Sequence, residues 1–226
     1  MKRIGVLLVI LGLMIGASSA SALDLAKHGG VSGNLGLMLF TSGDDFGSDN
    51  GLRFIGQAAF KYNFSQRVAG VIESGWGWNS YSRPAVGETP ANDDTLAVVV
   101  PTTIGLMYRF HYGETRLWPH VGAGVGIYSL GVKDSFRTWA NGNNGTDRLT
   151  WSSPGFYLRG GGEFLFENGA AVHAEVLYHN IFSDEGDRFP DGWGNQNTSF
   201  AQLRVGATYY FSLGGSSAVP EDEDED

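Results

Sequence analysis

The chain has 226 residues, a formal net charge of −9 and no cysteine. These values exclude a disulfide-stapled scaffold, a cysteine-ligated zinc site and the basic surface of a nucleic-acid-binding protein. Glycine is abundant at 34 residues, 13% of residues are aromatic and only 17% are charged. Without a three-residue glycine period, this composition is typical of a β-barrel rather than of collagen.

The N-terminus has the pattern of a cleaved export signal. Lys2 and Arg3 precede an apolar stretch from Ile4 to Ile15, and Ala20-Ser21-Ala22 provides the small residues of a cleavage site. We therefore predict a signal peptide over residues 1–22, with cleavage after Ala22. No later stretch reaches the roughly 20 apolar residues of a membrane helix.

Eight segments with period-2 alternation follow. They span approximately 31–41, 52–64, 67–80, 96–111, 117–131, 155–166, 170–180 and 199–211. In the second segment Phe54, Phe60 and Tyr62 fall on one face, and Arg53 and Lys61 fall on the other. This pattern predicts an all-β fold, an eight-stranded antiparallel up-and-down transmembrane β-barrel over residues 23–213.

The connections between these segments alternate in length. Those after the even-numbered segments are short, whereas the others are long, polar and rich in Gly, Asn and Asp. Short turns at one end and long loops at the other are typical of outer-membrane barrels, in which the short turns are periplasmic. Glu221–Asp226 is a run of six acids, so we expect residues 214–226 to be a disordered, acidic periplasmic tail.

An aromatic-x-aromatic motif recurs at the end of every even-numbered segment, always in the outward phase. These positions at one rim predict a periplasmic aromatic girdle. Its members are Tyr62, Phe64, Tyr108, Phe110, Phe164, Phe166, Tyr209 and Phe211. Trp76, Trp78 and Tyr178 lie outward near the other ends of their segments and are candidates for a second girdle.

The connection Glu167-Asn168-Gly169 can be tested by asking which loop length places the apolar faces of both flanking segments on the same side. A three-residue loop with Gly169 in a left-handed conformation pairs Phe166 with Ala170 and Glu163 with His173. Both apolar faces then point outward. With a two-residue Asn-Gly turn, the apolar faces of the two segments would point to opposite sides.

The ionisable residues of the segments share the inward phase. We expect a lumen charge network that plugs the barrel, because eight strands leave an interior that side chains can fill. Its predicted members are Arg53, Lys61, Glu73, Arg109, Arg159, Glu163, His173, Glu175 and Arg204, with His120 and His179 on the same face. An ion-conducting pore is the alternative.

Signals of catalysis are weak. The sequence lacks the G-x-S-x-G, H-E-x-x-H and P-loop motifs. His173 and His179 lie roughly 20 Å apart along one strand, too far to bind one metal ion. His179, Ser183 and Asp184 contain the residue types of a hydrolase triad but lie close together in sequence. We therefore predict neither a catalytic site nor a metal site nor a cofactor, and no enzymatic activity.

The C-terminal segment carries the most specific motif. Arg204-x-Gly206-x-x-Tyr209-x-Phe211 resembles the β-signal of outer-membrane proteins, and residues 24–213 resemble the small OmpA/OmpX-type barrels and the outer-membrane β-barrel domain family. The resemblance implies insertion by the barrel-assembly machinery and contact with outer-membrane lipids and lipopolysaccharide. Unlike many members, this chain continues beyond the final aromatic residue, from Ser212 to Asp226.

Members of that family differ in activity, so the fold alone does not define the function. We expect localisation to the cell outer membrane and a structural or surface-interaction role, with a ligand bound by the extracellular loops and no nucleic-acid partner. A narrow porin-like channel and a lipid A-modifying hydrolase remain the alternatives.

Overall fold

The computed structural model describes residues 24–42, 53–83, 92–110, 115–133, 148–183 and 197–213. These residues form eight strands and no helix. The strands are β1 (His28–Ser42), β2 (Arg53–Asn63), β3 (Val68–Arg83), β4 (Asn92–Arg109), β5 (Leu117–Lys133), β6 (Arg148–Leu165), β7 (Ala170–Ile181) and β8 (Thr198–Ser212).

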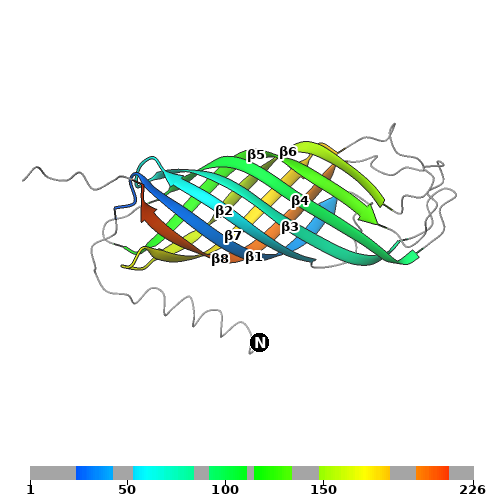
Figure 1. Cartoon of the computed structure of the whole chain (residues 1–226), viewed down its shortest axis with the longest axis horizontal. Coiled ribbons are helices and arrows are strands. Elements are labelled where there is room, and N and C mark those ends of the chain that lie inside the picture. The colour runs from blue at the N-terminus through cyan, green and yellow to red at the C-terminus, as the bar shows by residue number, and fades with distance from the viewer. Residues whose placement is uncertain are drawn as a thin grey trace, which may run out of the picture.

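Each strand pairs antiparallel with its sequence neighbours, and β1 pairs with β8 to close the barrel (Figure 1). The predicted eight-stranded antiparallel barrel is therefore confirmed. The short connections 64–67, 110–116 and 166–169 meet at one end, which we call the short-turn end. The four connections that include residues 43–52, 84–91, 134–147 and 184–196 belong to the opposite end, which we call the long-connection end.

The largest difference from the predicted segments is at the start of β6. This strand begins at Arg148 rather than at residue 155, and Trp151, Ser153 and Pro154 lie within it, paired with β5. Two serines followed by a proline resemble a loop in sequence. Proline lacks an N–H donor, yet Pro154 still accepts a hydrogen bond from the Phe182 N–H at 2.9 Å through its carbonyl oxygen.

The β6–β7 turn has the predicted geometry. Gly169 has φ = 81°, and the Phe166 N–H donates to the Ala170 carbonyl oxygen at 2.8 Å. Glu163 lies directly opposite His173 in the register. The three-residue loop is confirmed, and glycine is favoured at residue 169 because L side chains rarely adopt this positive φ.

The alternation of buried and exposed residues along the strands separates two chemical environments. The outward positions expose a belt of large apolar side chains, and the inward positions are buried. The belt includes Val31, Leu35, Phe54, Ile72, Ile104, Leu106, Val125, Ile127, Leu158, Val176, Leu203 and Val205. An apolar exterior around a polar interior is the inverse of a water-soluble fold and is typical of a barrel in a membrane.

Glycines on the inner wall make room for large side chains. Gly105 and Gly124 are opposite each other in the β4–β5 pair. A Cβ atom on Gly124 would lie 2.6 Å from Cε1 of Tyr157 and 2.7 Å from the Gly105 Cα. The Tyr157 ring therefore uses the volume that these glycines leave free.

Candidate functional site: the lumen and its two ends

All nine residues predicted for the lumen charge network lie on the inner wall. Each is at most 5% exposed, as are His120 and His179. They come from six strands, β2 to β4 and β6 to β8. Charged groups buried this deeply require opposite charges and hydrogen bonds to offset their desolvation.

Glu163 is the centre of the network nearer the short-turn end. Its Oε1 lies 3.0 Å from Lys61 Nζ, and its Oε2 lies 3.2 Å from Arg109 Nε. The Tyr210 hydroxyl donates to Oε1 at 2.7 Å. One carboxylate thus connects β2, β4, β6 and β8 across the lumen.

The two cations beside Glu163 have further partners. Arg109 donates to Asn63 Oδ1 at 2.6 Å and to the Tyr210 hydroxyl at 2.8 Å. Lys61 donates to Thr208 Oγ1 at 3.0 Å. Together with the contacts to Glu163, these bonds distribute the donors of both cations among β2, β6 and β8, as a buried charged network requires.

Arg204 is the centre of a second network in the middle of the barrel. Its guanidinium contacts Glu73 Oε2 at 2.7 Å through Nη1 and Glu175 Oε2 at 2.5 Å through Nη2. Gln57 donates to Glu73 Oε1 at 2.9 Å and accepts from Arg204 Nη1 at 2.9 Å. Charge-assisted bonds of this kind are the stronger class of hydrogen bond in proteins.

The remaining inward ionisable groups surround these networks. His120 Nε2 lies 2.7 Å from Glu175 Oε1, and His173 Nε2 lies 2.6 Å from Asn34 Oδ1. Arg159 is less tightly held, because its nitrogens lie 3.6 Å from Glu73 and 3.8 Å from Glu175. The Arg53 guanidinium lies 4.6 Å from the Phe40 ring centroid, in a cation–π geometry.

An apolar cluster of inward side chains lies towards the long-connection end. His179 stacks on Phe200 with 4.4 Å between ring centroids, and the Tyr128 hydroxyl lies 2.9 Å from His179 Nδ1. The cluster comprises Met38, Phe40, Ile55, Val99, Tyr128, Leu130, Trp151, Ile181 and Phe200.

A second apolar cluster lies at the short-turn end, and its least expected member is Leu25. This residue precedes β1, yet it is fully buried with Trp118, Leu165, Ala171 and Tyr210. The Lys27 N–H donates to the Asn63 carbonyl oxygen at 2.8 Å, and Asn63 Nδ2 donates to the His28 carbonyl oxygen at 3.0 Å. These bonds anchor the segment that carries Leu25 against β2.

The same N-terminal segment is ordered by Asp24. The Ala26 N–H donates to Asp24 Oδ1 at 2.9 Å, and Gln66 Nε2 donates to the same oxygen at 3.2 Å. These two hydrogen bonds hold the pKa of the Asp24 carboxyl below its ordinary value. The ionised carboxylate thus joins the segment to the β2–β3 turn.

The residues of the hydrolase hypothesis have structural partners. Ser183 is fully buried, donates to Thr198 Oγ1 at 2.8 Å and accepts from the Thr198 N–H at 2.9 Å. His179 is held by Tyr128 and Phe200, as described above, and Asp184 lies outside the described residues. Among the residues that the structure describes, no group of three or more His, Asp or Glu could hold a metal ion.

The predicted aromatic girdle residues lie outside the barrel at the short-turn end. The pairs Tyr62–Phe64, Tyr108–Phe110 and Phe164–Phe166 have ring centroids 5.1–5.2 Å apart in edge-to-face arrangements. Tyr209 and Phe211 occupy the equivalent outward positions near the end of β8. At the other end Trp76 and Trp78 are exposed, with ring centroids 5.1 Å apart.

The predicted β-signal residues are divided between the two faces of β8. Arg204 and Gly206 face the lumen, whereas Tyr209 and Phe211 face outward. The sequence analysis did not single out Tyr210, which lies between those two aromatics and bonds both Arg109 and Glu163. The alternation of inward and outward residues along β8 places Tyr210 on the inward face, and this pattern could have identified it. Leu25 belongs to no alternating pattern, so no comparable signal marked it.

The sequence matches a known family of outer-membrane barrels. The family model of the outer membrane protein β-barrel domain matches residues 8–211. No curated protein matches the chain.

Solved structures provide the fold comparison. Neisserial surface protein A is 13% identical and has a TM-score of 0.55, with 81% of this chain and 97% of that chain covered. OprG from Pseudomonas aeruginosa has the same identity and TM-score, with 85% and 99% covered. Ail of Yersinia pestis, solved with the heparin analogue sucrose octasulfate, is 12% identical with a TM-score of 0.50, and 82% and 99% are covered.

At these identities the structural matches show the fold alone. The family match covers nearly the whole chain and independently agrees with the closed eight-stranded barrel, its apolar exterior and its polar interior. The chain therefore belongs to the outer membrane protein β-barrel family, as an integral outer-membrane protein.

Proposed function

We propose that this protein is a non-conducting, non-enzymatic barrel with a structural or surface-interaction role through the connections at its long-connection end. The observation that carries the proposal is the filled lumen. Two charge networks centred on Glu163 and Arg204 lie between apolar clusters at both ends, and Leu25 belongs to the cluster at the short-turn end.

The composition of the long connections supports a surface role and indicates the class of partner. Residues 43–52, 84–91, 134–147 and 184–196 together contain ten Asp or Glu and two Arg. They also include aromatic residues, among them Trp139 and Trp193. An excess of acids with interspersed aromatics favours a cationic partner, and it does not favour a sulfated polyanion such as the ligand in the Ail structure.

The proposal includes an orientation and an export route. The short-turn end is periplasmic, and the aromatic girdle residues lie at the lipid headgroups of that side. Residues 1–22 are removed as a signal peptide, the tail 214–226 remains in the periplasm, and Arg204, Gly206, Tyr209 and Phe211 are read by the barrel-assembly machinery. Outer-membrane lipids and lipopolysaccharide surround the apolar belt.

Conductance in planar phospholipid bilayers tests the closed lumen. The refolded wild-type protein should produce no steady single-channel current over hours at 1 M KCl. Glu163→Gln combined with Leu25→Ala removes the central negative charge of one network and the apolar residue below it, so this variant should show transient openings. Steady current from the wild type would overturn the proposal.

A narrow channel is the second candidate, and one observation favours it. Thr103 Oγ1, His120 Nδ1 and the Arg159 guanidinium nitrogens are buried without a hydrogen-bond partner within the described part of the chain. Groups of this kind on one side of the lumen are compatible with a hydrated strip. Lipid A hydrolysis has less support because Ser183 is fully buried and bonded to Thr198.

The surface role can be tested with cells that express the protein. Binding of a fluorescent cationic peptide should exceed that of its acidic counterpart by at least fivefold. Replacing Asp184, Glu185 and Asp187 with Asn or Gln should reduce this preference. If both peptides bind equally, the acidic connections do not select the partner.

A further inference from the structure

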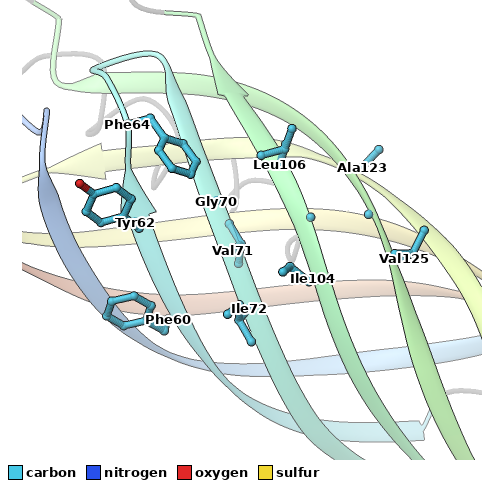
Figure 2. Close-up of a pocket in the computed structure, with 12 residues that line it drawn as sticks. Phe60, Tyr62, Phe64, Gly70, Val71, Ile72, Ile104, Leu106, Ala123 and Val125 are labelled. Atoms are coloured by element: carbon cyan, nitrogen blue, oxygen red, sulfur yellow. The ribbon is translucent and has the colours of Figure 1, made fainter.

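The outer wall of the barrel has an apolar groove of about 640 Å³ across β2 to β5 (Figure 2). Phe60, Tyr62 and Phe64 form one side of it, and Ile104 and Leu106 lie further along the wall on β4. Ala123 and Val125 on β5 bound the far side. The groove lies outside the lumen and is separate from both charge networks.

Two small outward residues make the wall concave. Gly70 lies opposite Leu106 in the β3–β4 pair, and Ala123 lies opposite Leu106 in the β4–β5 pair. In the next outward row Ile72, Ile104 and Val125 occupy the corresponding positions and are all more than half exposed. At Gly70 the Phe64 ring lies over the wall, with its Cε2 3.2 Å from the position of a Cβ atom on that glycine, so the open floor of the depression is at Ala123.

The groove has a defined position along the membrane normal. It extends from Tyr62 and Phe64, at the short-turn rim, towards the middle of the wall at Phe60 and Ile72. Aromatic rings at a barrel rim lie at headgroup level. With the proposed orientation, the groove lies at the depth of the acyl chains of the periplasmic leaflet.

The Tyr62 hydroxyl is a polar group at the rim end of the groove. Arg67 does not line the groove, but it is exposed in the turn between β2 and β3, three residues from both Phe64 and Gly70. The other groove residues of β2 to β5 are apolar or glycine. An apolar groove with a cation at its headgroup end is complementary to an anionic lipid, with phosphate beside Arg67 and hydrocarbon along Leu106 and Ala123.

We propose that this groove is a specific binding site for one acyl chain of an anionic phospholipid of the periplasmic leaflet. The groove is continuous with the lipid-facing belt, so hydrocarbon is the medium that contacts it. Its concave shape contacts more of a chain than the convex wall elsewhere does. Because the chain comes from lipid rather than from water, selectivity depends on shape and on Arg67.

Native mass spectrometry of the full-length mature protein, released from nanodiscs of phosphatidylglycerol and phosphatidylcholine, tests the site. The wild type should retain one phospholipid, with phosphatidylglycerol favoured. Ala123→Leu fills the floor of the groove and should reduce the retained fraction at least fivefold. Ala174→Leu, a matched change at an exposed outward position on β7, should leave it within twofold of wild type.

A separate variant tests the selectivity of the groove for the lipid headgroup. Arg67→Gln should reduce the preference for phosphatidylglycerol about threefold while phosphatidylcholine is still retained. Heat-modifiable gel migration verifies that each variant is folded, and loss of a motionally restricted component of spin-labelled lipid in Ala123→Leu provides a second readout.

Three results would overturn the proposal. The first is equal lipid retention by wild type, Ala123→Leu and Ala174→Leu. The second is a wild-type dimer that Ala123→Leu dissociates, because a second copy would then cover the groove. The third is retention of lipid A in preference to phospholipid when both are present. If Arg67→Gln leaves the preference for phosphatidylglycerol over phosphatidylcholine unchanged, the site does not select an anionic headgroup.

Discussion

The guanidinium of Arg204 and the carboxylate of Glu175 face each other directly across the β7–β8 pair. Nη2 and Nε of Arg204 lie 2.5 and 2.6 Å from the same oxygen, Oε2 of Glu175. Both side chains are almost fully buried. Removal of one member leaves an uncompensated charge inside the barrel.

Glu175→Ala should therefore lower the free energy of unfolding by about 3–5 kcal/mol. Urea titration of protein refolded into phospholipid vesicles, followed by tryptophan fluorescence, measures the change. Glu167→Ala is the matched control, because Glu167 pairs with Arg116 at the exposed rim and its side chain is 72% exposed. Such a pair contributes about 0–1 kcal/mol. Equal unfolding midpoints for the two variants would contradict the buried network.

Glu163 and Arg159 should differ in the same assay. Glu163 makes three contacts of 3.2 Å or less, to Lys61, Arg109 and Tyr210, whereas the ion pairs of Arg159 are 3.6 and 3.8 Å long. Both single variants, Glu163→Gln and Arg159→Gln, should destabilise the barrel, and Glu163→Gln should do so by about 1–3 kcal/mol more. A larger loss for Arg159→Gln would mean that its contacts are tighter than these distances.

The glycine of the β-signal also has a structural role, and two variants can separate it from recognition. A Cβ atom on Gly206 would lie 2.6 Å from the Gly33 carbonyl oxygen and 2.6 Å from His173 Nε2. Gly206→Ala should therefore fold poorly in purified lipid vesicles and in cells alike. The double variant Tyr209→Ala/Phe211→Ala should fold in vesicles but accumulate unfolded in the periplasm.

Gel migration after refolding and fractionation of cells measure the two outcomes. Normal insertion of Tyr209→Ala/Phe211→Ala in cells would remove the β-signal assignment. Normal folding of Gly206→Ala in vesicles would show that the inner wall adapts at this position.

Burial of Leu25 can be tested by thiol labelling, because the chain has no cysteine of its own. Leu25→Cys in the refolded protein should react with a polymer-linked maleimide at least tenfold more slowly than Arg67→Cys, which lies exposed at the same rim. In urea the two rates should converge. Equal rates in the folded state would show that Leu25 does not occupy the lumen.

The proposed orientation predicts the accessibility of two tags. An epitope inserted at Gly142, in the connection between β5 and β6, should be labelled on intact cells. An epitope appended after Asp226 should require permeabilisation. Labelling of the C-terminal tag alone on intact cells would invert the orientation, and with it the surface role of the long connections.

Sequence periodicity predicted the strand number, the faces and the β6–β7 turn, because the side-chain period of two is local. It could not predict which charges meet. Lys61 and Glu163 are 102 residues apart and come together only through the tilt and stagger of the closed barrel. The start of β6 was missed because Ser152, Ser153 and Pro154 are residues that local propensity assigns to loops.

The apolar clusters at the two ends of the lumen could not be predicted from sequence alternation either. Tyr128, Trp151 and Phe200 share the inward phase with charged residues, and hydrophobicity alone favours the outside of a membrane barrel for such residues. Their burial follows from closure at the lumen end, where the interior has room for aromatic rings. Leu25 lies before the first strand, so its place depends on the Lys27–Asn63 and Asn63–His28 bonds rather than on alternation.

The last strand supplies partners to most of the interior. Through Arg204, Thr208 and Tyr210, β8 contacts side chains of β2, β3, β4, β6 and β7. Glu163 contacts Lys61 and Arg109 without β8, but these three residues gain Thr208 and Tyr210 as partners only when this C-terminal strand docks against β1. Docking of β8 therefore completes the network in one event. Closure should consequently be the slow, all-or-none step of assembly, and a chain shortened before residue 204 should remain an open, hydrated sheet rather than a weakened barrel.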